Sequence, residues 1–409
     1  MATDEHNDLS DYTIHLRRAL QYCEREQDVL VELKQTLRGL KTIERAVEVR
    51  NASLEWFRRE HLPSKTIPLV HVDDICASEF RRKFHRGNLP CRIRGLDGHQ
   101  FAALSTQWRA GDGAINRDWF CNVVGDDTTV PVRQQTTGAI DQDGRAEECK
   151  TLEYSMRQWA DCEPGPHLYL KDWHLVKHLQ ERGICETLYE VPEFFQRDLL
   201  NGFLTRVTGG DYKFVYWGPA GSRTAIHSDV LNSFSWSYNV VGEKKWTFYP
   251  PDEDISIEVY QQAGECMFVP SGWKHEVANV VETLSINHNW ATSANIDQLV
   301  DCVIAEMKAV EGECREWGIT GFEAREAMLR GCAGLDLSGC FFLLLSSLLD
   351  LDCTTDTVDL EVDAALLKGA LELLMRDAEH SELQNRLSAV LASEDLAQQA
   401  LGIAKDLLS

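Results

Sequence analysis

The stretch GSRTAIHSDVLNSFSWSYNVVGEKKWTFYPP, residues 221–251, carries a histidine and an aspartate separated by one residue. On a β-strand, residues two positions apart point to the same side of the sheet. His227 and Asp229 can therefore present one nitrogen and one oxygen to the same point. Because such tripeptides occur by chance in many proteins, the pair indicates a site only together with a matching residue elsewhere.

A candidate for that residue is His275, which lies forty-six residues after Asp229 in EVYQQAGECMFVPSGWKHEVANV, residues 258–280. It follows a Gly-Glu turn, a short strand and a Pro-Ser-Gly-Trp turn. In a small barrel, a strand-turn-strand segment of this length can return to the same mouth. Two histidines and one carboxylate form a facial triad that leaves coordination positions open, which is characteristic of non-haem Fe(II) oxygenases.

The surrounding segments predict a β-rich domain. Short stretches rich in β-branched and aromatic residues are separated by Gly and Pro turns. These stretches are HLYLKDWHL, KFVYWGP, KKWTFYP, CMFVP and TLSINHNW. Several short strands spaced in this way are typical of a barrel or a sandwich. Upstream, TIPLVHV and CRIRGL predict strands that flank the helical segment SEFRRKFHRGN.

Helical patterns flank the β-rich part on both sides. Residues 11–60 predict helix, either docked on the following domain or forming a coiled-coil dimer arm; the short and broken apolar repeat favours docking. After Trp290 helical spacing returns and continues to Ser409. We therefore expect an N-terminal helical extension over 1–65, a catalytic domain over 66–292 and a C-terminal helical region over 293–409. The helical regions offer a possible homodimer interface.

Composition and charge narrow the choice of partners. The formal net charge of -24, without a Lys/Arg cluster, argues against direct nucleic-acid binding and suits a basic protein partner without naming one. The most apolar run, CFFLLLSSLLDL at 340–351, is too short to span a bilayer and predicts a buried helix, so no membrane partner is expected. Thirteen cysteines without a Cys-x-x-Cys motif, and the absence of an apolar N-terminal signal, favour a reducing compartment.

Three segments taken together resemble the JmjC-domain oxygenases. They are GPAGSRTAIHSD, SWSYNVVGEKKWTFYPP and AGECMFVPSGWKHEVANVVETLSINHNW. The resemblance covers roughly residues 66–290 and is densest over 165–290. It implies a mixed α and β fold built on a double-stranded β-helix, a jelly-roll or cupin-like barrel. It also implies Fe(II) as the metal, with 2-oxoglutarate and O2 as cosubstrates.

The resemblance also assigns site residues. It implies that His227, Asp229 and His275 are the iron ligands and catalytic centre. The remaining residues match positions that surround 2-oxoglutarate: Lys244 for the distal carboxylate, Thr224 and Tyr169 in the same pocket, and Asn287 and Asn289 near the cosubstrate and iron. Two features depart from the family pattern. Ser237 stands where several relatives carry Asn, and the loop after Pro251 is short.

Some assignments have plain structural alternatives. Lys244 could be a solvated lysine at a strand end beside Lys245, and Tyr169 could be a core residue. Thr224, three residues before His227, would face the opposite side of a regular strand, so its role requires a bend.

The closest resemblance is to a JmjC group that hydroxylates a lysyl side-chain carbon of the eukaryotic translation termination factor, which makes that reaction the first hypothesis. Oxidation of another protein residue, including demethylation of N-methyl-lysine, is the alternative. A third possibility is a catalytically inactive JmjC binding module. The resemblance and the absence of targeting signals imply a cytoplasmic protein, with a nuclear pool left open.

Overall fold

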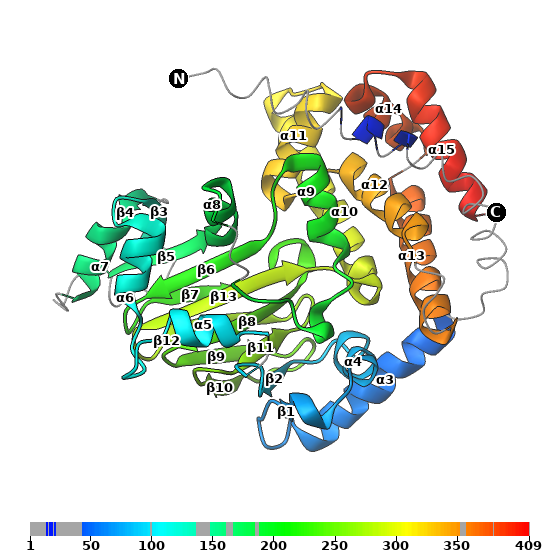
Figure 1. Cartoon of the computed structure of the whole chain (residues 1–409). Coiled ribbons are helices and arrows are strands. Elements are labelled where there is room, and N and C mark those ends of the chain that lie inside the picture. Colours follow the sequence, from blue (N-terminus) through cyan, green and yellow to red (C-terminus); the bar gives the residue numbers. More distant parts are fainter. Residues whose placement is uncertain are drawn as a thin grey trace.

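A computed structural model describes residues 14, 16–18, 20–21, 43–98, 100–135, 148–160, 167–184, 188–351, 357–378 and 380–408. Two β-sheets form one side of the molecule, and a group of helices from the C-terminal part of the chain forms the other (Figure 1).

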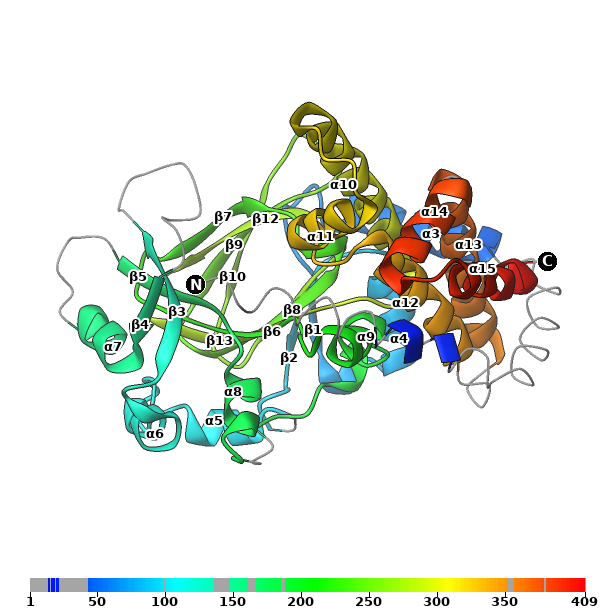
Figure 2. The same cartoon turned by 90° about the horizontal axis from the view of Figure 1, so that it is seen from above.

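One sheet has nine strands and the other has four. The larger sheet runs in the order β1 (Leu69–His71), β2 (Cys91–Arg94), β11 (Cys266–Val269), β8 (Phe234–Val241), β13 (Thr283–Trp290), β6 (Lys213–Gly218), β5 (His167–Trp173), β3 (Thr129–Gln135) and β4 (Glu148–Thr151). The smaller sheet runs in the order β10 (Ile257–Gln261), β9 (Lys244–Tyr249), β12 (Lys274–Asn279) and β7 (Arg223–His227). Seen from above, the smaller sheet lies opposite β6, β8 and β13 (Figure 2).

From β6 to β13 the chain crosses repeatedly between these two sheets. β6, β8, β11 and β13 belong to the larger sheet, whereas β7, β9, β10 and β12 belong to the smaller one. This winding is a double-stranded β-helix, and it confirms the predicted mixed α and β fold with a jelly-roll barrel. The crossing from β8 to β9 needs Gly242, whose φ is +88°, because a Cβ there would lie 2.2 Å from the Glu282 carbonyl oxygen.

Large aromatic side chains fill the β-domain core. Trp236, Trp246, Trp273 and Trp290 are each at most 3% exposed and act as packing residues. Shorter helices cover this domain: α4 (Ala77–Phe80), η2 (Arg81–His85), α5 (Ala102–Gln107), α6 (Arg117–Trp119), η3 (Phe120–Gly125), α7 (Leu152–Ala160) and α8 (Leu175–Glu181). Helix α9 (Leu199–Thr208) instead buries its apolar residues in the core of the C-terminal helices.

The C-terminal helices have their own apolar core. They are α10 (Ile296–Trp317), α11 (Phe322–Ala333), α12 (Leu337–Leu349), α13 (Thr357–Asp377), α14 (His380–Leu391) and α15 (Glu394–Leu408). Every residue of α12 is buried, so the apolar run near 340 is a core helix as predicted. Within the part of the chain that is described, no single helix meets the length and apolarity needed to cross a membrane, although the bent pair of α11 and α12 does so jointly.

The described part of the N-terminal segment docks on the rest of the molecule. Helix α3 (Ile43–Glu60) packs against both η2 and α13 (Figure 1). Leu16 and Leu20 enter the apolar core of the C-terminal helices, and the Arg17 side chain donates to the Leu391 carbonyl oxygen. Docking was expected, but the contact with the C-terminal helices was not. Residues 22–42, which carry most of the proposed coiled-coil repeat, lie outside the described residues.

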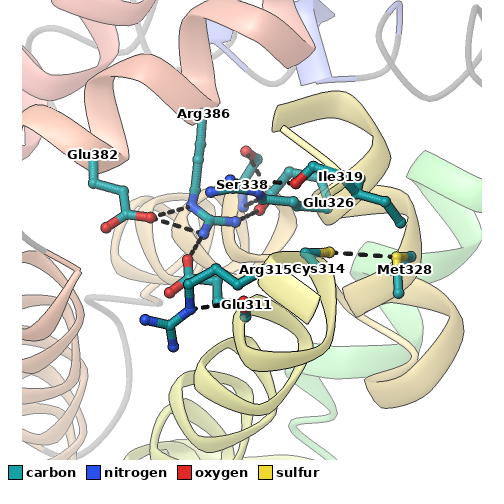
Figure 3. A network of polar contacts seen from close by, with 10 residues as sticks. Glu311, Cys314, Arg315, Ile319, Glu326, Met328, Ser338, Glu382 and Arg386 are labelled. Atoms are coloured by element: carbon teal, nitrogen blue, oxygen red, sulfur yellow. Dashed lines mark hydrogen bonds and ion pairs between the residues drawn. The ribbon is translucent and has the colours of Figure 1, made fainter. Parts of the chain in front are cut away.

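A buried arginine ties three of the C-terminal helices together (Figure 3). Arg386 on α14 is 1% exposed, and its guanidinium donates to Glu326 of α11 at 2.6 Å and to Glu382 of α14 at 2.8 Å. It also donates to Glu311 of α10. The second oxygen of Glu326 accepts from the backbone and side chain of Ser338. One guanidinium therefore serves three carboxylates, and Glu326 is the most deeply buried of them.

We predict that Arg386→Met destabilises the fold by about 3–5 kcal/mol, because it leaves a fully buried Glu326 carboxylate without its cation. Denaturant unfolding followed by circular dichroism measures the change. Arg376→Met is the matched control, since that guanidinium is exposed beside Asp377 and its loss should change stability little. Equal stability of the two variants would contradict the assigned role of the Arg386 network.

Candidate metal centre and cosubstrate pocket

The register of β7 against β12 brings the two predicted histidines together. His227 and His275 are direct cross-strand partners, and their ring centroids lie 4.4 Å apart. Asp229 was expected on a strand, but β7 ends at His227 and Asp229 precedes the short helix η5 (Val230–Asn232). Its backbone is still extended, with φ -63° and ψ 151°, and one ligand atom from each residue lies within 4.8 Å of the other two.

Backbone carbonyls orient both imidazole rings. Nδ1 of His227 lies 2.8 Å from the Ala225 carbonyl oxygen, and Nδ1 of His275 lies 3.0 Å from that of Trp273. A carbonyl can only accept, so the proton sits on Nδ1 and the lone pair of Nε2 is available to a metal. Burial lowers the pKa of His275, which favours the neutral ring that a metal requires.

The carboxylate of Asp229 is fixed in a similar way. The Ser235 hydroxyl donates to Oδ2 of Asp229 at 2.7 Å, while Oδ1 lies 4.0 Å from Nε2 of His227. One oxygen is thus held by the protein and the other faces the histidines. Two imidazole nitrogens and one carboxylate oxygen are a donor set that fits Fe(II), so the residues present suit the metal that the sequence implied.

Lys244 is a buried residue rather than a solvated lysine at a strand end. It begins β9, is 2% exposed, and donates from Nζ to the Ser285 hydroxyl at 2.6 Å. Burial, and then the nearby charge of Lys171, lower the pKa of Lys244 to about 7. The neighbouring Lys245 points to the opposite side of β9 and pairs with Glu258 at 2.6 Å. Strand alternation therefore decides which of the two lysines enters the barrel.

A β-bulge supplies the bend that Thr224 needs. On β12, His275 and Val277 are two residues apart, but their partners on β7 are His227 and Thr224, which are three apart. The extra residue reverses the alternation, so Thr224 faces the same side as His227. Thr224 is half-buried on this side. The structure thus brings Thr224 to the face on which the resemblance expects it.

The other expected pocket residues lie on the larger sheet. Tyr169 of β5 is 3% exposed, and its ring lies 6.2 Å from that of Tyr216 on β6. Asn287 accepts from the hydroxyls of Ser285 and Ser237 at 3.0 and 3.2 Å. Asn289 donates to the Ser233 hydroxyl at 3.1 Å. Ser237, which departs from the family pattern, therefore contributes a hydroxyl to the polar groups around Asn287.

Sequence reasoning did not identify Ser235 and Ser285, although both contact expected site residues. Ser235 holds Asp229, and Ser285 holds Lys244. The sequence did contain a pattern that indicates Ser235. Ser233, Ser235 and Ser237 occupy alternate positions after the His-x-Asp motif, so they share one face of the strand region. By contrast, His288 points away from the pocket and contacts Tyr189 at 2.5 Å, as expected of a structural histidine.

A double-stranded β-helix that carries two histidines and a carboxylate beside a buried lysine has the architecture of an Fe(II)- and 2-oxoglutarate-dependent oxygenase. No family model matches the chain. Individual proteins do: the 2-oxoglutarate and iron-dependent oxygenase JMJD4 of Homo sapiens is 30% identical over 308 residues, which is 65% of this chain and 72% of the human protein. JMJD4 of Danio rerio is 29% identical over 319 residues, 68% of this chain and 74% of the fish protein.

The chain belongs to the JMJD4 family of JmjC-domain oxygenases, for which iron is the metal and 2-oxoglutarate and O2 are the cosubstrates. It is also similar to the arginine-specific demethylase JMJ20 of Arabidopsis thaliana, at 35% identity over 296 residues, 60% of this chain and 61% of the plant protein.

We predict that Ser235→Ala weakens metal binding by about 10- to 100-fold, since it removes the donor that orients Asp229. Competition titration of the purified protein with Mn(II) and a metallochromic chelator measures the affinity. Ser155→Ala is a suitable control because Ser155 is also fully buried but bonds to the Thr151 carbonyl on a distant element. Unchanged affinity in Ser235→Ala would show that Asp229 is held without the Ser235 hydroxyl.

Proposed function

We propose that this oxygenase hydroxylates a lysyl side-chain carbon of a protein substrate, with the eukaryotic translation termination factor as the first candidate. The observation that carries the oxygenase chemistry is the convergence of His227, Asp229 and His275. The lysyl substrate rests on the closer resemblance of LYLKDWHL, SFSWS and FVPSGW to that hydroxylase group. Such a substrate would place the activity in the cytoplasm.

Different residues of the chain have different roles in the proposed reaction. Nε2 of both histidines and Oδ1 of Asp229 would hold the metal, and three protein donors would leave coordination positions for the cosubstrates. Bound iron supplies the oxidation chemistry, in which 2-oxoglutarate and O2 yield succinate, carbon dioxide and a hydroxylated C–H position. Lys244 and Thr224 hold the far carboxylate of 2-oxoglutarate, and Ser285 orients Lys244.

Aromatic side chains on β6 support a lysyl substrate. Phe214 and Tyr216 of β6, and Tyr212 just before that strand, follow one another at every second position, with ring separations of 6.2 and 6.3 Å. They are half-buried, and Phe214 is the cross-strand partner of Asn287. A half-buried aromatic strip suits the aliphatic stem and the cationic head of a lysine. The acidic net charge of the chain is compatible with a basic target.

Demethylation is the second candidate, and the similarity to a plant protein named an arginine-specific demethylase favours it. Hydroxylation of an N-methyl carbon gives an unstable product that releases formaldehyde, so the same donor set can serve both reactions. The inactive binding module is the least supported alternative because all three metal donors and Lys244 are in place.

We predict one added oxygen atom on a lysine when purified termination factor is incubated with this protein, Fe(II), ascorbate and 2-oxoglutarate. Peptide mass spectrometry locates the added mass, and succinate release is measured in parallel. His227→Ala is the inactive control, and His71→Ala is the matched active one, since His71 lies on the edge strand β1 and contacts Asp73 outside the donor set.

Each outcome separates the candidates. Loss of a methyl group with formaldehyde release would replace hydroxylation by demethylation. Iron-dependent succinate release without a modified lysine would rule out this substrate and keep the oxygenase. A folded, metal-bound protein that releases no succinate with any candidate substrate would favour the binding module.

A further inference from the structure

The turn that follows Asp229 contains two residues with strained backbones. Leu231 and Asn232, both in η5, have φ values of +57° and +46°. This left-handed region is unfavourable for a residue with a Cβ atom, and a side chain as bulky as leucine is rarely found there. Such a conformation persists only where its surroundings hold it, and strain of this kind gathers at functional sites.

The core of the C-terminal helices holds the Leu231 side chain. Leu231 is 2% exposed and belongs to that core, and η5 packs against α10. Val230, the preceding residue, packs against the same core. Burial of these aliphatic groups offsets the unfavourable backbone conformation. The turn after Asp229 is therefore attached to the helical region and not to the barrel alone.

Hydrogen bonds extend this attachment to Asp229 itself. The backbone N–H of Asn232 donates to the Asp229 carbonyl oxygen at 3.0 Å. Asn295, which is fully buried and directly precedes α10, donates from Nδ2 to the Asn232 carbonyl oxygen at 3.5 Å. Because β7 ends at His227, Asp229 lies beyond the strand ladder. Its backbone therefore depends on the turn that follows it.

A second set of bonds joins the same turn to the segment that carries His275. The Ser271 hydroxyl donates to the Asn232 carbonyl oxygen, and Ser271 belongs to the Pro-Ser-Gly-Trp turn that precedes His275. Ser271 is 1% exposed. The Asn88 side chain fixes its backbone, accepting from the Ser271 N–H at 2.8 Å and donating to the Ser271 carbonyl oxygen at 2.9 Å. The two ligand-bearing segments are thus joined outside the pairing of β7 with β12.

We propose that Leu231 and Ser271 are positioning residues of the metal centre. Leu231 anchors the Asp229 turn in the core of the C-terminal helices, and Ser271 fixes the same turn against the segment of His275. The helical region is then a structural part of the metal site. The proposal rests on the metal centre formed by His227, Asp229 and His275, and it is independent of which substrate is oxidised.

The test combines Mn(II) affinity of the purified full-length protein with the visible absorption spectrum of its Co(II)-loaded form, which reports ligand geometry. We predict that Leu231→Ala weakens Mn(II) binding by about tenfold or more, because contacts that orient a metal ligand change metal affinity by about 10- to 100-fold. The Co(II) spectrum should change as well. Leu231→Met, which keeps a flexible apolar side chain of similar volume, should restore most of the affinity.

Leu401→Ala is the matched control for a cavity in the same core. Leu401 is also 2% exposed, but it lies on α15, which packs against α13 and α14. This variant should lose stability and keep both the Mn(II) affinity and the Co(II) spectrum of the unmodified protein. Circular dichroism at the titration temperature confirms that each variant is folded.

Ser271→Ala tests the second contact and keeps the proposal falsifiable should Leu231→Ala not fold. It should also weaken Mn(II) binding, whereas Ser155→Ala should not. A folded Leu231→Ala protein that binds Mn(II) as Leu401→Ala does, or a folded Ser271→Ala protein that binds it as Ser155→Ala does, would overturn the proposal. Failure of the unmodified protein to bind Mn(II) would instead contradict the metal centre, and with it the proposed function.

Discussion

The pairing of β7 with β12 is the constraint on which the site depends. His227 stands directly opposite His275 on the neighbouring strand. Strand pairing itself therefore holds together two imidazoles from distant parts of the sequence. A slip of one residue would turn His275 to the outer face of the sheet and remove the donor set. The bulge beside this pair has a second effect, since it turns Thr224 to the pocket side while keeping His227 in place.

Electrostatics give the barrel its second organising principle. The metal end of the pocket is held by a carboxylate that accepts from Ser235, and the far end by an ammonium that donates to Ser285. Between them the wall consists of hydroxyl and amide groups, such as Ser237 and Asn287, which can bind polar atoms without carrying charge. Burying Lys244 has a free-energy cost, visible in its lowered pKa, and we propose that the anionic cosubstrate offsets that cost.

Sequence patterns predicted the strands and the donor residues, because strand-forming composition and the His-x-Asp spacing are local properties. They did not predict the bulge at Thr224, which depends on the register of β12, or the place of Asp229 beyond the strand end. Helical periodicity likewise indicated that α3 buries one face, but periodicity cannot name a partner, and contact with α13 emerged only from the fold.

The most direct test of the account is a crystal structure of the protein with Mn(II) and 2-oxoglutarate, with the metal located by anomalous scattering. The account predicts metal within bonding distance of Nε2 of His227, Nε2 of His275 and Oδ1 of Asp229, and the distal carboxylate of 2-oxoglutarate against Lys244. Metal bound elsewhere, or a cosubstrate whose distal carboxylate avoids Lys244, would contradict it.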